Sequence, residues 1–134
     1  MNTQALSSNS IPVAVKIFTW ILICAGCFFF YVYTFNPSLS FPNATLDSYS
    51  AKLGFASAGV RIAGSVLALI ISVMANNARW LFITLISRIF IESGDVIIGL
   101  VLDGVTANTF ALVVLAAVET WAVLKLWNVI KTKS

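Results

Sequence analysis

Five ionisable residues lie inside long apolar stretches of the sequence, and they are its main candidates for chemistry. They are Arg61, Arg88, Glu92, Asp95 and Glu119. A charged side chain near the centre of a bilayer costs about 2.5 to 3.5 kcal/mol on insertion scales, and it is usually kept only where it faces other helices or a polar cavity. We therefore expect these residues to face the interior of a helical bundle, where they could bind a proton or a small ligand.

The helical rise per residue predicts which of these side chains lie at equal depth. Arg61 and Glu92 would each lie about 12 Å from the outer ends of their helices, and Arg88 and Glu119 at about 18 to 20 Å. We expect these two pairs to form, which would leave Asp95 without a dedicated cation and one turn from Glu92. The excess carboxylate could accept a proton or bind a cation, whereas the alternative is that the pairs only fix helix register.

The segment Cys24-Ala25-Gly26-Cys27 has the spacing of a dithiol redox pair. Cys24 would lie about 12 Å below the charge of Lys16, where a thiolate is desolvated. The chain has two cysteines in total, so no second pair could relay electrons. Packing of small apolar side chains is the simpler interpretation. A membrane thiol or quinone oxidoreductase using Cys24 and Cys27 is the alternative.

Composition excludes most soluble enzyme classes. The chain is 60% hydrophobic and 10% charged, whereas a soluble domain is about 45 to 50% apolar and about a quarter charged. The absence of histidine excludes histidine triads and histidine metal sites, and two cysteines cannot form a four-thiolate centre. The eight basic residues are scattered, so we expect no nucleic-acid partner. We expect no catalytic residue, cofactor or metal, and an enzyme is the less favoured class.

Four apolar stretches are long enough to cross a hydrocarbon core about 30 Å thick. They cover residues 13–33, 53–74, 80–102 and 106–130. Asn36-Pro37, Asn76-Asn77 and Asp103-Gly104 mark the connections between them. The fold class predicted is an all-α membrane protein, a single antiparallel four-helix transmembrane domain over residues 1–134 in which the last two helices form a tight hairpin.

The distribution of basic residues predicts the orientation in the membrane. With four spans, one side holds five cations and the other holds only Lys52. The five are Lys16, Arg79, Lys125, Lys131 and Lys133. Because basic flanks remain in the cytoplasm, we expect both termini to be cytoplasmic in a multi-pass protein of the cell membrane.

Small residues surround Arg61 on its predicted helix face. They are Gly54, Ser57, Ala58, Gly64, Ser65, Ala68 and Ser72. Such rows allow another helix to approach closely. We therefore expect this face to point at a neighbouring helix, and it also offers a contact for a homodimer or for a partner in a membrane complex.

Several short motifs resemble the DoxX-like group of small four-helix bacterial membrane proteins. They are Arg61-Ile62-Ala63-Gly64, Asn77-Ala78-Arg79, Arg88 and Gly94-Asp95. The resemblance implies a four-helix bundle in a bacterial inner membrane and no agreed activity, and the CxxC segment departs from it. The resulting hypothesis is a small transport or ligand-binding protein with a buried arginine and carboxylate network, or a subunit of a membrane complex.

Overall fold

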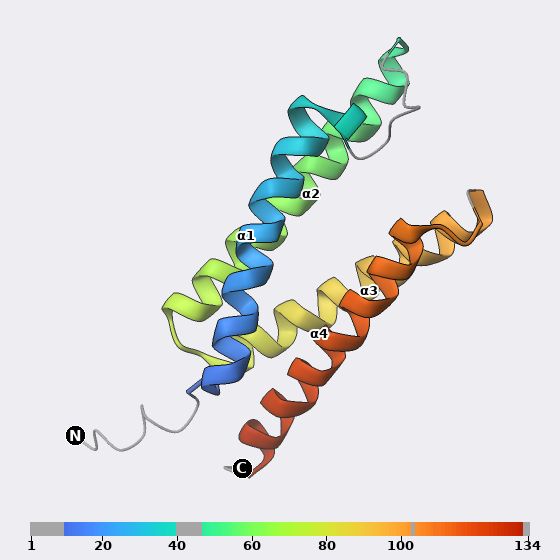
Figure 1. The fold of residues 1–134 in the computed structure, drawn as a ribbon. Coiled ribbons are helices and arrows are strands. Elements are labelled where there is room, and N and C mark those ends of the chain that lie inside the picture. Colours follow the sequence, from blue (N-terminus) through green and yellow to red (C-terminus); the bar gives the residue numbers. More distant parts are fainter. Residues whose placement is uncertain (1–9, 40–46, 103, 133–134) are drawn as a thin grey trace. The chain divides into compact units, whose positions relative to one another are not determined.

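The computed structural model describes residues 10–39, 47–102 and 104–132, and these residues are helical almost throughout (Figure 1). The elements are α1 (Val13–Phe35), a 3-10 turn η2 (Pro37–Leu39), α2 (Tyr49–Met74), α3 (Ala78–Leu102) and α4 (Ala107–Lys131). The all-helical prediction is confirmed, and each predicted stretch corresponds to one α-helix.

The ends of two helices differ from the predicted boundaries for local reasons. α2 begins at Tyr49 rather than at residue 53, because the Ser48 hydroxyl accepts a hydrogen bond from the backbone N–H of Ala51 and so caps the helix N-terminus. α1 continues to Phe35 and stops before Pro37, which cannot donate a backbone hydrogen bond.

Three of these helices are long and apolar enough to cross a membrane. They are α1, α2 and the part of α4 from Thr109 to Lys131. α3 has 25 residues, which at about 1.5 Å per residue would also reach across a bilayer. Its middle carries three charged residues, Arg88, Glu92 and Asp95, and its place as a fourth span stays a prediction.

The chain divides into two compact units, which are described separately. The α3–α4 unit contains the described residues of Met1–Lys16 and Ser72–Ser134, and the α1–α2 unit contains Ile17–Ile71. The first therefore includes the start of α1 and the end of α2.

Both helices of the α3–α4 unit begin at a side-chain cap. The Asn77 side-chain oxygen accepts hydrogen bonds from the N–H groups of Arg79 and Trp80, and Thr106 accepts from the N–H of Thr109 at 3.2 Å. Gly104 has a φ of 73°, which glycine adopts without steric cost. Asp103, the other residue of the predicted tight turn, lies outside the described residues.

Three contacts along the length of α3 and α4 show that they form an antiparallel hairpin, as predicted (Figure 1). The rings of Phe82 and Trp127 stack with centroids 5.7 Å apart. Arg88 contacts Glu119. A Cβ at Gly99 would lie 3.4 Å from the Thr109 hydroxyl. The fully buried apolar residues of this hairpin are Ala78, Leu81, Leu85, Ala122 and Leu126.

Ile11, just before α1, lies beside the turn between α2 and α3. The backbone N–H of Ile11 donates to the Asn76 side-chain oxygen at 3.2 Å, and Ile11 is buried. Asn76 has a φ of 48°, a left-handed conformation that asparagine tolerates better than most residues. The beginning of α1 and the Asn76-Asn77 turn are therefore held together.

Two glycines allow close packing inside the α1–α2 unit. A Cβ added to Gly26 of α1 would lie 2.4 Å from Val66 Cγ2, and one added to Gly59 of α2 would meet the Thr34 hydroxyl. At Gly54 and Gly64, on the face of Arg61, an added Cβ would meet no described atom within 4 Å. Within this unit, α1 therefore packs closely on α2 at Gly59 and Val66. A homodimer contact through the face of Arg61 stays a prediction.

Candidate functional site

The middle of the α3–α4 hairpin holds one guanidinium between two carboxyl groups. Arg88 Nε donates to Glu119 Oε1 at 2.8 Å, and Arg88 Nη2 donates to Glu92 Oε1 at 2.6 Å. The first contact joins α3 to α4, and the second joins neighbouring turns of α3. We call Arg88, Glu92 and Glu119 the Arg88 cluster. The predicted pairing of Arg88 with Glu119 is confirmed.

All three side chains of the Arg88 cluster are removed from solvent. Glu119 is fully buried and Glu92 is 7% exposed, while the Arg88 side chain is 13% exposed. Both glutamates accept hydrogen bonds from a charged donor, and such bonds are roughly twice as strong as neutral ones. The cluster is therefore a buried ionic network that binds the two helices of the hairpin to each other.

Each glutamate leaves one oxygen without a hydrogen bond. In the described part of the chain, Glu92 Oε2 and Glu119 Oε2 are buried and have no hydrogen-bond partner. The two carboxyl groups lie side by side, because they bind Nε and Nη2 of the same guanidinium. Buried polar atoms are nearly always hydrogen-bonded, and an unsatisfied one commonly marks an absent water, an ion or a functional group. These two oxygens thus provide a place for a further donor or cation.

The net charge of the Arg88 cluster also favours a bound proton or cation. If both glutamates were ionised, the Arg88 cluster would carry a net charge of −1, since one guanidinium would balance one carboxylate. An unbalanced buried charge is costly and is usually neutralised. A proton or a small cation at the free oxygens would remove it.

Polar residues of α3 lie on both sides of the Arg88 cluster along the helix. Thr84, one turn before Arg88, is half-buried and lies 3.4 Å from the Ser72 hydroxyl. Asp95 is half-buried and acts electrostatically on Glu92. Asp95 also takes part in other interactions, and the expectation that none of them is with a dedicated cation stays a prediction.

Glu92 has a partner that the predicted pairs did not include. It contacts Arg88, whereas equal depth matched it with Arg61. Arg61 is an exposed residue of α2 with interactions of its own, and its pairing with Glu92 stays a prediction. The spacing of four residues between Arg88 and Glu92 was a usable signal, because residues at i and i+4 are neighbours on a helix surface.

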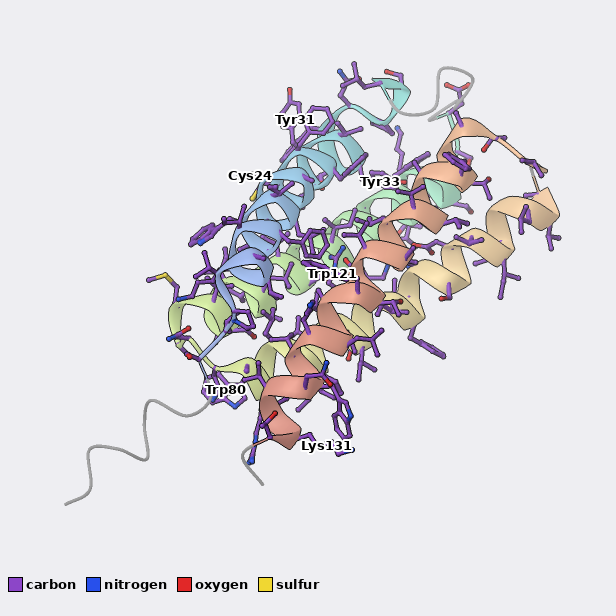
Figure 2. The ribbon with its side chains drawn as sticks, turned by 60° about the horizontal axis from the view of Figure 1, so that its bottom comes forward. Cys24, Tyr31, Tyr33, Trp80, Trp121 and Lys131 are labelled. Carbon is purple, nitrogen blue, oxygen red and sulfur yellow. The ribbon has the colours of Figure 1, made fainter. Side chains whose placement is uncertain are left out.

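The cysteine segment does not form a disulfide. Cys24 and Cys27 are free and exposed on α1, and Figure 2 shows the Cys24 side chain projecting from this helix. Among the described residues there is no group of three or more His, Cys, Asp or Glu placed to hold a metal ion.

Aromatic and basic side chains share one end of the α3–α4 hairpin. Trp80 at the start of α3 and Lys131 at the end of α4 lie close to the same end in Figure 2. Trp127 lies about one turn before Lys131 and is 49% exposed. Tryptophan and lysine are enriched where a membrane protein meets the headgroup region. This end is thus typical of a membrane interface.

Comparisons with known proteins identify no relative: no protein-family model, no curated protein and no solved structure matches this chain. The site and the helical architecture therefore define the class, a helical membrane protein with a buried arginine and glutamate salt bridge.

Proposed function

We propose that this protein is a multi-pass membrane protein that binds a proton or a small cation at the Arg88 cluster. Its four helices would form one antiparallel bundle, and it would act as a small transport or ligand-binding protein, alone or within a membrane complex. The observation that carries the proposal is the pair of buried carboxyl oxygens on Glu92 and Glu119 without hydrogen-bond partners among the described residues. Ionisable groups inside membrane proteins commonly mark ion or proton pathways.

Two observations support the proposed orientation, with both termini in the cytoplasm. The hydrogen bond between Ile11 and Asn76 would keep the N-terminus and the α2–α3 connection on the same side of the membrane. Trp80 and Lys131 lie at one end of the α3–α4 hairpin, where basic residues favour the cytoplasmic side. The DoxX-like motifs add the expectation of a bacterial inner membrane.

Proton flux into liposomes tests the proposal. Purified protein would be reconstituted into vesicles that contain a pH-sensitive dye, and a potassium diffusion potential would draw protons inward. We expect uptake above that of protein-free vesicles, and loss of this excess in Glu119→Gln. Lys125→Gln is the matched control, because Lys125 lies on the same helix but is exposed.

A second measurement tests whether the site binds sodium. If sodium replaces protons as the ligand, sodium binding measured by calorimetry would be lost in Glu119→Gln and kept in Lys125→Gln. Absence of both proton uptake and sodium binding in the wild-type protein would refute the proposal.

A structural role is the second candidate, because the Arg88 cluster joins α3 to α4. In that case Glu119→Gln would lower stability and leave any flux unchanged when equal amounts of folded protein are compared. Stability and flux must therefore be measured on the same samples.

A further inference from the structure

The two glutamates of the Arg88 cluster are the only glutamates in the chain. They come from different helices and meet at one buried place, where Arg88 binds one oxygen of each. The other oxygen of each is buried without a hydrogen-bond partner in the part of the chain that is described. Two carboxylates in this position repel each other, and both oxygens can only accept hydrogen bonds.

We propose that Glu92 and Glu119 share a single proton at neutral pH, with the O–H of one carboxyl group donating a hydrogen bond to the other. A proton on one of these neighbouring carboxyl groups would replace their repulsion by a hydrogen bond, because a protonated carboxyl becomes a donor while the ionised one accepts. The same proton changes the net charge of the cluster from −1 to zero. This inference names the ligand of the site and rests on the proposed function.

A proton fits this place better than a metal cation does. Arg88 lies 2.6 Å and 2.8 Å from the two carboxyl groups, and its fixed positive charge would repel a second cation at such short range. Two free carboxyl oxygens are also fewer than the six to eight oxygen ligands that calcium takes. A shared proton requires neither a further ligand nor a displacement of Arg88.

The remaining charges of the α3–α4 unit favour retention of the proton. On α3, Asp95 lies near Glu92 and adds a negative charge, and Arg88 is the cation already engaged by both carboxyl groups. On α4, Lys125 is exposed and lies nearly two turns beyond Glu119. In the described contacts, the positive charge that faces the two glutamates is therefore that of Arg88.

Selective labelling can observe the glutamate pair in the unaltered protein. Protein made with glutamate carrying ¹³C in the side-chain carboxyl group contains two labelled sites, so solid-state NMR in lipid bilayers reports only Glu92 and Glu119. At pH 7 we expect one protonated and one ionised carboxyl group. They would appear as two signals, or as signals averaged midway if the proton moves rapidly between them.

Two variants separate sharing from simple burial. In Glu119→Gln, the Arg88 guanidinium balances Glu92 alone, so we expect the protonated fraction to be lost. In Asp95→Asn both glutamates remain, so we expect the protonated fraction to be retained. In detergent-unfolded protein both glutamates should be ionised at pH 7, since the ordinary glutamate pKa is about 4.3.

The outcomes distinguish this inference from the proposed function. Two fully ionised glutamates in the folded wild-type protein at pH 7 would overturn the shared proton, and sodium-dependent movement of their signals would then still support the proposed function. A shared proton in a protein that shows neither proton uptake nor sodium binding would support the inference and refute the proposed function. If Glu119→Gln keeps the protonated fraction on Glu92, burial rather than sharing holds the proton and the inference is wrong.

Discussion

Replacement of Gly26 by alanine tests the close packing of α1 on α2. The added Cβ would lie 2.4 Å from Val66 Cγ2, far inside van der Waals contact. Valine in a helix is largely confined to one rotamer, so relief requires the helices to move apart. Overpacking of this kind costs about 1 to 3 kcal/mol. We expect Gly26→Ala to destabilise the protein despite the better helix propensity of alanine.

Gly64→Ala is the matched control for Gly26→Ala. It makes the same chemical change in α2, another long apolar helix, but its added Cβ would meet no described atom within 4 Å. The gain in helix propensity, about 1 kcal/mol, is common to both variants and cancels in their difference. The difference in their free energies of unfolding should therefore be about 1 to 3 kcal/mol, the overpacking cost alone.

Unfolding in mixed detergent micelles, followed by circular dichroism, would measure this difference. A second change, Val66→Ala, removes the obstructing methyl group and leaves the Val66 Cβ position at 3.9 Å, an ordinary contact. Val66→Ala should therefore lessen the harm of Gly26→Ala. Equal stabilities of Gly26→Ala and Gly64→Ala, or simple additivity of Gly26→Ala and Val66→Ala, would refute the described packing.

Three further predictions concern other parts of the chain. Asn77→Ala should lower the free energy of unfolding by about 1 kcal/mol, because it removes the cap of α3, and an unchanged detergent unfolding curve would contradict this. A reporter fused after Ser134 should be active only if it is of a type that works in the cytoplasm. In a chain without its native cysteines, Ser48→Cys should be labelled by a reagent added outside the cell. Labelling of that cysteine only after the membrane is opened would show the opposite orientation. If Glu92 shares a proton with Glu119, the double replacement Arg61→Gln with Glu92→Gln should cost as much stability in thermal unfolding as the two single losses added together. A cost smaller than that sum would instead establish the Arg61–Glu92 pair that equal depth predicts and would contradict the shared proton.

The helices could be predicted from sequence because their signals are local. Each apolar run ends at residues that cannot continue a helix or that cap the next one, such as Pro37 and Asn77. The early start of α2 depends on a single hydroxyl, that of Ser48, and serine is common enough that its capping role is not evident beforehand. Boundaries were therefore less predictable than the helices themselves.

Half of the ionic network was predictable for a simple geometric reason. In a tight hairpin, residues at equal distance from the turn lie opposite each other, so Arg88 could be matched with Glu119. Assigning each cation a single partner concealed the contact of Arg88 with Glu92. The free oxygens of the glutamates depend on side-chain rotation, which neither composition nor spacing determines.

The ion pair across the hairpin has a consequence for how the chain enters the membrane during synthesis. In the four-span arrangement, α3 carries Arg88, Glu92 and Asp95, each of which costs about 2.5 to 3.5 kcal/mol near the centre of an isolated inserting helix. α4 brings the buried carboxyl group that Arg88 contacts, so each helix compensates part of the other's insertion cost. The translocon would then release α3 into lipid together with α4, and a ribosome stalled between them would leave α3 retained at the translocon.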